Sequence, residues 1–446
     1  MNYKTPLILT LFLLLTSCGG EKSSKSQEKQ YQDTIMTCEE DSTDTLTKIS
    51  KYSSNIKIDN PTNATKILVA GISTTEDIKF NQQDLYHLFQ TEYFWAEKTK
   101  KDLDYTTYSS PQSLIDALKY SKDRWSFAIT KQAYKDISSQ KSGGFGFICQ
   151  DVSAGCHVIY VRIDSPVDKI GLKRGDIITK INQQRATHTL IHNISQQQQE
   201  ELISIKVLRP NTNERCSAKV TPREYTYKVV LAKIMETDEH HKVGYFRLDS
   251  FLGDKEISKQ IDMAFTKFKE ASISKLIIDL RYNGGGSVDI ASKLLNKLTH
   301  KRDSQPQFTL AWNDDYKQND EVYRFKTEKN SIDSEQIIFL TTKDSASASE
   351  LVIAAMKPYL GEKNVIQIGD STHGKPVGMS GKIDTNYYYF LINFVVKNSI
   401  GFYDYFEGLD VTEGCKVDDD PYHEMGDRKE SMLKAALRYI DKESCQ

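Results

Sequence analysis

The spacing of apolar positions changes twice along the chain. In the first long stretch, residues 80–137, apolar side chains recur every three or four positions, as at Leu85, Leu88 and Phe89. This period is that of an amphipathic helix. Ser110 followed by Pro111 is a favourable helix start, because proline fits the first helical position. The pattern therefore predicts a small helical subdomain over residues 76–140.

Short apolar runs separated by turns follow between residues 142 and 222. The alternation at Ile203, Ile205 and Val207 is typical of a strand, and glycines cluster at residues 143–146. We expect a mainly β domain at residues 141–224.

Strands and helices alternate after residue 229, which predicts a largely parallel sheet covered on both faces. The spacing of Ile257, Ile261 and Phe265 predicts an amphipathic helix. We expect strands at 243–248, 276–280 and 337–340, a later pair of strands at 387–390 and 394–396, and helices at 257–268, 348–356 and 430–440. Residues 225–446 are predicted to form one α/β core with a C-terminal helix.

The N-terminus carries an apolar run at residues 7–15 after Lys4. The run is too short to span a bilayer and has the length of a signal-peptide core, so residues 1–17 are predicted to be a signal peptide. Leu15-Thr16-Ser17-Cys18 resembles the lipobox of bacterial lipoproteins, which implies acylation of Cys18. An ordinary signal peptide cleaved nearby is the alternative. The resemblance implies an exported lipoprotein, anchored by its N-terminal lipid to the outer membrane.

The segment after Cys18 is polar, and residues 21–44 contain too few apolar side chains to fold alone. We therefore expect residues 18–75 to be a polar tether and lead-in.

Composition is that of an ordinary soluble protein, with 38% hydrophobic and 27% charged residues. The net charge of −2 gives no electrostatic reason to expect a nucleic-acid partner. The cysteines and histidines lack zinc-site spacing, so neither a metal nor a cofactor is predicted.

Six cysteines follow Cys18, and an exported location permits disulfides. Cys149 with Cys156, and Cys415 with Cys445, are plausible pairs. The sequence alone does not fix their connectivity.

Two junctions carry candidate chemistry. The first is the turn Asn283-Gly284-Gly285-Gly286, directly after a predicted buried strand. Consecutive glycines leave backbone N–H groups uncovered, as an oxyanion pocket requires. A phosphate-binding turn and a plain tight turn remain open, although the spacing of the known phosphate motifs is absent.

The second junction is the serine-rich run at residues 345–350. Ser347 and Glu350 fit the Ser-x-x-Glu capping box at the start of a helix. The same position would expose the Ser347 hydroxyl beside free N–H groups at the positive end of the helix dipole. The local pattern leaves a helix cap and a nucleophile equally open.

Together with Gly374-Lys375, these junctions resemble the motifs of the C-terminal processing peptidases, also called tail-specific proteases. The resemblance covers about residues 80–440 and implies a crotonase-like α/β core with a serine nucleophile and a lysine general base. By matching position, Ser347 is the nucleophile and Lys375 the base. The oxyanion donors fall on the amides of Gly284, Gly285 and Ala348.

The β domain resembles a PDZ domain, in which a glycine-rich loop holds the terminal carboxylate of a peptide. Gly144, Phe145, Gly146 and Phe147 match that loop. A PDZ fold that acts only as a spacer or lid is the alternative.

These resemblances imply a cell-envelope endopeptidase whose partners are protein or peptide substrates. One departure is Met379, which occupies the position where the family has a glutamine that orients the lysine. The alternative function is therefore a weakly active or inactive peptide-binding lipoprotein. His373 leaves a Ser–His arrangement open as well.

Overall fold

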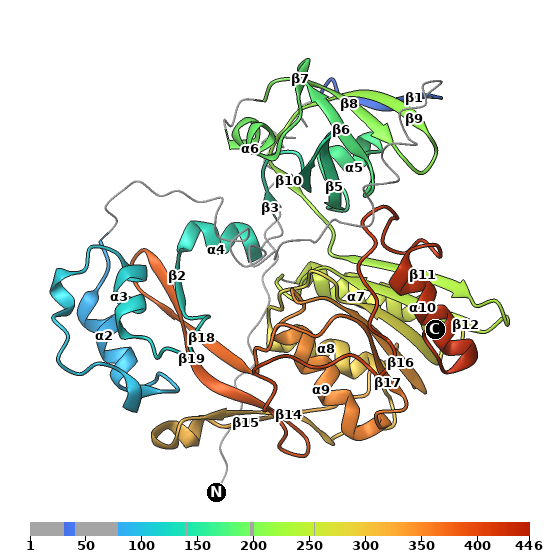
Figure 1. The fold of residues 1–446 in the computed structure, drawn as a ribbon. Coiled ribbons are helices and arrows are strands. Elements are labelled where there is room, and N and C mark those ends of the chain that lie inside the picture. Colours follow the sequence, from blue (N-terminus) through green and yellow to red (C-terminus); the bar gives the residue numbers. More distant parts are fainter. Residues whose placement is uncertain (1–30, 41–78, 139–140, 197–199, 254) are drawn as a thin grey trace, which may run out of the picture.

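The computed structural model describes residues 31–40, 79–138, 141–196, 200–253 and 255–446 (Figure 1). The predicted signal peptide, the predicted acylation site Cys18 and most of the predicted tether lie outside the described residues. Within the described ranges, no helix has both the length and the apolar character needed to cross a bilayer.

The N-terminal subdomain is mainly helical, as the periodicity predicts. Leu85 and Phe89 of one helix pack with Leu114 and Leu118 of another. Its elements are α2 Gln82–Gln90, η3 Ala96–Lys98, η4 Tyr105–Thr107, α3 Pro111–Leu118, β2 Phe127–Thr130 and α4 Lys131–Ser138. The strand β2 was not predicted within the helical subdomain, and it pairs antiparallel with β19 Tyr387–Asn398 of the core.

The β domain is a sheet in the order β1-β9-β8-β6-β5-β4, with β7 paired to β6. Figure 1 shows it standing apart from the other two units, joined by β3 Lys141–Ser142 and β10 Tyr225–Thr226, which pair with each other. Its elements are β1 Thr34–Glu40, β4 Phe147–Val152, β5 Gly155–Val161, α5 Pro166–Ile170, β6 Ile177–Ile181, β7 Gln184–Arg185, α6 His188–Gln196, β8 Ile203–Arg209 and β9 Glu214–Val220.

Strand β1 corrects the prediction that residues 18–75 form only a tether. It pairs antiparallel with β9, and a disulfide joins Cys38 to Cys216. The segment is too polar to fold alone, but β9 supplies its backbone partners and Met36 packs against the core of the β domain. The predicted pairs Cys149–Cys156 and Cys415–Cys445 are both confirmed.

The core contains a five-stranded sheet in the order β11-β12-β13-β16-β17. The pairs β12–β13, β13–β16 and β16–β17 are parallel, which confirms the predicted alternation, and only β11 runs antiparallel. The strands are β11 Val230–Glu236, β12 Lys242–Leu248, β13 Lys275–Asp279, β16 Gln336–Thr341 and β17 Val365–Gly369. The helices are α7 Lys255–Glu270, α8 Val288–Leu298, α9 Ala348–Leu360 and α10 Ser431–Lys442.

A second, antiparallel sheet was not predicted as a unit. It has the order β15-β14-β19-β18, with β2 added beside β19. The two short strands expected at 387–390 and 394–396 are one continuous strand, β19, because the side chains between them, Leu391 and Ile392, are also buried. The remaining elements are β14 Pro306–Trp312, η5 Asp314–Asn319, β15 Glu321–Arg324 and β18 Val377–Ile383.

The core and the N-terminal subdomain form alternating layers. Helix α10 covers one face of the parallel sheet through Leu433 and Leu437, and α7, α8 and α9 cover the other face. Residues of the second sheet, such as Phe308, join the same cluster as α8 and α9. Its opposite face packs on the N-terminal helices. The parallel sheet is therefore buried on both sides, as its apolar strands require.

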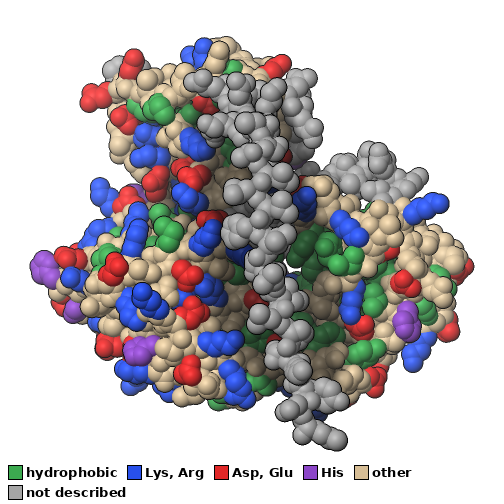
Figure 2. All heavy atoms as spheres, turned by 180° about the vertical axis from the view of Figure 1, so that it is seen from behind, with side chains coloured by type: hydrophobic (Ala, Val, Ile, Leu, Met, Phe, Trp, Pro, Cys, Tyr) green, Lys and Arg blue, Asp and Glu red, His purple; other side chains and the backbone are tan. Residues whose placement is uncertain are grey.

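Buried ion pairs attach the β domain to the core. Arg174 of the β domain donates to Asp419 at 2.7 Å, and Arg281 bonds the same carboxylate at 3.2 Å. Arg281 is fully buried and also pairs with Asp279 and Glu430. Elsewhere the surface charges are mixed: on the face in Figure 2, acidic and basic side chains are interspersed, consistent with the net charge of −2.

Candidate functional site

Three loops meet where parallel strands β13, β16 and β17 end. They carry the triple-glycine turn 284–286, the serine run 345–350 and the segment that leads to Lys375. The carboxyl ends of neighbouring parallel strands lie at one edge of a sheet, which is where such folds place ligands. The topology thus brings together residues that are 91 positions apart in the chain, from Gly284 to Lys375.

The three serines of the run have different environments. Ser345 is fully buried and donates to the Leu280 carbonyl at 2.8 Å. Ser349 is also fully buried and donates to the Asn283 carbonyl at 2.9 Å. Ser349 therefore links the first turn of α9 to the glycine turn, and Ser345 links the residues before α9 to Leu280, the residue after β13. Ser347 is the one of the three that lines the main cavity.

Ser347 has an unusual backbone conformation, with φ 57° and ψ −112°. A non-glycine residue with positive φ is strained, and such strain is found at functional turns held by their surroundings. The strand–turn–helix context is that of a nucleophile elbow, which exposes a serine Oγ above a sheet.

The glycine turn packs directly on this elbow. Gly285 has φ +98°, and a Cβ placed there would lie 2.8 Å from the Ser347 Cβ. A Cβ on Gly284 would meet nothing within 4 Å, so Gly284 borders open space in the cavity. Only glycine allows the approach at Gly285.

The predicted oxyanion amides divide into two groups. No described residue accepts a hydrogen bond from the amide of Gly284 or of Ala348, and both residues line the cavity. The Gly285 amide instead donates to Asn283 Oδ1 at 2.9 Å. In this structure the Gly285 N–H is therefore engaged by the buried Asn283 side chain, whereas the other two amides have no such partner among the described residues.

One buried carboxylate connects the serine loop to the lysine loop. Glu350 Oε2 accepts from the amides of Ser347 at 2.7 Å and Lys375 at 2.9 Å. Its Oε1 accepts from Thr372 Oγ1 at 2.5 Å and from the Gly374 amide at 2.6 Å. Burial raises the pKa of Glu350, while these four donors act in the opposite direction. The capping-box pattern predicted only the contact with Ser347.

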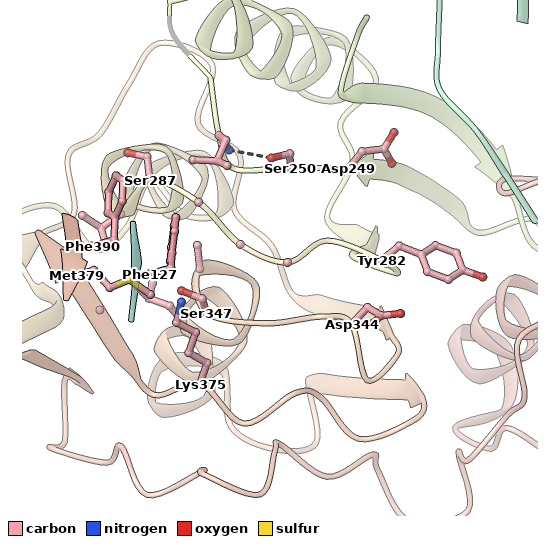
Figure 3. Close-up of a pocket in the computed structure, with 18 of the residues that line it drawn as sticks. Phe127, Asp249, Ser250, Tyr282, Ser287, Asp344, Ser347, Lys375, Met379 and Phe390 are labelled. Carbon is pink, nitrogen blue, oxygen red and sulfur yellow. Dashed lines mark hydrogen bonds between the residues drawn. The ribbon is translucent and has the colours of Figure 1, made fainter. Parts of the chain in front are cut away.

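Lys375 lies beside Ser347 in the cavity. Figure 3 shows the two side chains pointing toward each other, and both residues line the cavity. Burial lowers the pKa of Lys375 to about 8, against smaller opposing effects from Asp123 and Glu350. No hydrogen bond joins Ser347 Oγ to Lys375 Nζ among the described residues; such contacts often tighten only when substrate binds.

His373 does not line the cavity. Its Nε2 accepts from Trp125 Nε1 at 3.2 Å. This nitrogen is directed at Trp125, and no hydrogen bond joins the His373 ring to Ser347 in the described part of the chain, so the geometry does not favour a Ser–His arrangement. Met379 does line the cavity but has no polar group that could orient the lysine amine as an amide would.

The cavity has a volume of about 510 Å³ and lies between the three units of the chain. The N-terminal subdomain contributes Phe127, Ile129 and Tyr134, and the β domain contributes residues such as Ile148 and Tyr160. Their apolar side chains, with Phe390 and Phe394 of β19, line much of the wall. This size and character suit a ligand with bulky apolar side chains.

The predicted carboxylate loop forms part of the β domain. Gly144 and Gly146 have φ of +88° and +95°, and the Phe145 carbonyl accepts from the Val167 amide. Phe147 begins β4, which in the described sheet has β5 on one side and no strand on the other. This free edge follows the loop, as β-strand addition of a peptide requires.

Potential metal ligands gather at two places in the described part of the chain, both outside the cavity. In one, Cys38 and Cys216 are joined as a disulfide next to Glu214. In the other, His241 bonds Asp441 and Glu239 pairs with Lys442 at the surface. The ligating groups of both clusters are thus largely paired within the protein.

The contrast between the two glycines gives a stability prediction. We expect Gly285→Ala to lower the free energy of unfolding by about 2 kcal/mol or more, because the new Cβ meets the Ser347 Cβ at a strained φ. Gly284→Ala is the matched control and should leave Tm near wild type. Equal thermal unfolding of the two variants would contradict the packing described.

Glu350→Gln should lower the free energy of unfolding by about 2–5 kcal/mol. The carboxylate accepts four hydrogen bonds, two on each oxygen, whereas the amide of glutamine has only one acceptor oxygen. Denaturant unfolding would measure the change. Glu321→Gln, on an exposed side chain of β15, is the control. A Glu350→Gln protein as stable as wild type would mean that Glu350 is protonated in the folded state.

Each of the three units matches a known protein family or domain. The profile of peptidase family S41 matches residues 242–385, that of the PDZ domain matches residues 143–220, and that of the peptidase S41 N-terminal domain matches residues 81–127. A CtpA-like serine protease of Staphylococcus aureus is 24% identical over 317 residues, covering 69% of this chain. One from Staphylococcus epidermidis is 26% identical over 309 residues, covering 67%. This chain spans 59% of the length of each relative.

An S41 protease structure from Bacteroides fragilis has the same fold, with a TM-score of 0.70 at 20% identity. The likeness covers 84% of this chain and 99% of that one. The predicted fold class, an α/β core with a PDZ domain and an N-terminal helical subdomain, is confirmed. The chain therefore carries a peptidase domain of family S41, a family of serine peptidases, together with the N-terminal domain of that family and a PDZ domain.

Proposed function

We propose that this chain is a serine endopeptidase with Ser347 as nucleophile and Lys375 as general base. The observation that carries the proposal is that both side chains line one cavity and point toward each other, with a lysine pKa lowered to about 8. A lysine is a base only when neutral, and burial without a direct carboxylate partner provides that state near neutral pH.

In the proposed mechanism, Lys375 Nζ takes the proton of Ser347 Oγ as the oxygen attacks the scissile carbonyl. The resulting ammonium then returns that proton to the leaving amine, and an acyl-enzyme remains on Ser347. Water, deprotonated by the same lysine, then attacks the ester carbonyl. The bond between the acyl carbon and Ser347 Oγ breaks, and the lysine returns the proton to that oxygen. The amides of Gly284 and Ala348 would stabilise the negative charge on the carbonyl oxygen, helped by the N-terminal end of helix α9.

Protein or peptide segments are the proposed substrates. The free edge of β4 and the loop of Gly144, Phe145, Gly146 and Phe147 support binding of an extended, C-terminal segment by the PDZ domain. The open cavity between the three units supports cleavage of a chain that passes through it.

We further propose an exported location, with Cys18 as the acylated residue that anchors the protein to the outer membrane. The sequence Leu15-Thr16-Ser17-Cys18 supports the anchor. Three disulfides support an oxidising compartment, because such bonds are rare where thiols are kept reduced.

A peptide-binding protein without turnover is the second candidate, and Met379 is the observation that favours it. No amide side chain stands at that position to orient the Lys375 amine.

A fluorophosphonate probe separates the two candidates. We expect covalent labelling of the wild-type chain and none of Ser347→Ala, because only an activated serine attacks phosphorus. Ser217→Ala, which removes an exposed hydroxyl of β9 outside the cavity, serves as a control for the specificity of labelling. Absence of labelling in a folded wild-type protein would favour the non-catalytic candidate.

The pKa of Lys375 determines how the proposed activity should depend on pH. The neutral amine is the active form, so kcat/KM should rise with pH through about 8 and level off above it. Lys375→Ala should lower kcat by roughly a thousandfold or more. Lys375→Arg should not restore it, because a guanidinium stays protonated. A fully active Lys375→Ala protein would exclude Lys375 as the base.

A further inference from the structure

The two ends of the cavity differ in chemistry. Figure 3 shows Phe127, Met379 and Phe390 on one side of Ser347, and Asp249, Tyr282 and Asp344 on the other. The aromatic end is ordered without a ligand, since the rings of Phe127 and Phe390 stack on each other with centroids 5.1 Å apart. A peptide bound across Ser347 would therefore meet an apolar wall on one side and acidic groups on the other.

The two carboxylates at the polar end differ in their partners. Asp249 accepts from Arg247 at 2.6 Å and 3.0 Å and from the Tyr160 hydroxyl at 2.9 Å, so its charge is compensated within the protein. Asp344 has no such partner: across the described ranges, no side chain or amide donates a hydrogen bond to it and no cation pairs with it. Of the two carboxylates that line the cavity, Asp344 is therefore the one whose oxygens could pair with a bound ligand.

Asp344 lies in the loop between β16 and α9, three residues before Ser347, and is partly buried. Burial and the nearby charge of Asp419 raise its pKa to about 7. The Asp419 carboxylate itself accepts hydrogen bonds from Arg174, Arg281 and the Tyr282 hydroxyl. A partly desolvated carboxyl beside another acid is stabilised by an arriving cation, and an ammonium or guanidinium group is the complementary ligand.

We propose that Asp344 is a specificity residue that selects peptides with a lysine or arginine side chain at the polar end of the cavity, while an apolar side chain occupies the aromatic end. This inference rests on the proposed peptidase function. The selected substrate class is a peptide with a bulky apolar residue on one side of the scissile bond and a basic residue on the other.

The test uses internally quenched, N-acetylated peptides with one fixed apolar residue, in which lysine, norleucine or glutamate is moved through the flanking positions. Acetylation removes the terminal amine as a competing cation. At pH 8, above the pKa of Asp344, we expect kcat/KM for lysine to exceed that for norleucine about tenfold at one position, as a partly buried ion pair allows.

Three variants test whether Asp344 causes the preference for lysine. Asp344→Asn should bring the lysine-to-norleucine ratio to about one, and Asp344→Lys should favour glutamate over lysine. Asp315→Asn makes the same chemical change on an exposed residue of η5 outside the cavity and should keep the wild-type ratio. Folding of each variant is checked by thermal unfolding.

Binding of the same peptides to Ser347→Ala keeps the two proposals separate. A lysine preference in the dissociation constant, lost in the Ser347→Ala, Asp344→Asn double variant, supports the inference even without turnover. No cleavage and no probe labelling by the wild type would overturn the proposed function alone. A ratio near one in both cleavage and binding, or a ratio that survives Asp344→Asn, would overturn the inference.

Discussion

The hydrogen bonds to the Glu350 carboxylate hold the candidate site together. Four donors from two loops converge on it: the amides of Ser347, Gly374 and Lys375 and the hydroxyl of Thr372. Burying a carboxylate is costly unless its oxygens are satisfied, and here each oxygen accepts two hydrogen bonds. Because Glu350 belongs to the first turn of α9, it fixes the main chain of Ser347 and of Lys375 relative to one rigid element. The loop that carries Lys375 is therefore positioned through its backbone.

The glycine turn is held to the same helix by a different set of bonds. The Asn283 carbonyl accepts from the Ala346 amide and the Ser349 hydroxyl, and its side chain bonds Leu248 and Gly285. This network explains why a strained φ at Ser347 can persist: the neighbours on both sides of it are fixed. Strain at a single residue survives only where the surrounding contacts determine the conformation.

Much of this arrangement could be predicted from sequence, because parallel strands and amphipathic helices have local periodicities. The helix that begins after Ser347 and the buried strand before the glycine turn follow from such patterns. What the sequence could not predict are contacts between distant segments. The bond from Thr372 to Glu350, the occupied amide of Gly285 and the pairing of β1 with β9 depend on tertiary packing, for which no local pattern exists. The local pattern left three serines open and only the family resemblance selected Ser347; the buried partners that distinguish Ser345 and Ser349 from it are seen only in the structure.

The cavity is lined by residues of all three units, so the domain boundaries predicted from sequence do not separate the candidate site from the other units. Strand β2 was predicted as part of a separate helical unit, yet it extends the second sheet of the core beside β19. This pairing carries Phe127 and Ile129 into the wall of the cavity, where Phe127 stacks on Phe390. On the opposite side, Arg174 of the PDZ domain pairs with Asp419, which also bonds Tyr282, the second residue before Gly284. The surroundings of Ser347 are therefore shared by all three units, and any ligand that fills the cavity contacts surfaces that only the assembled chain provides.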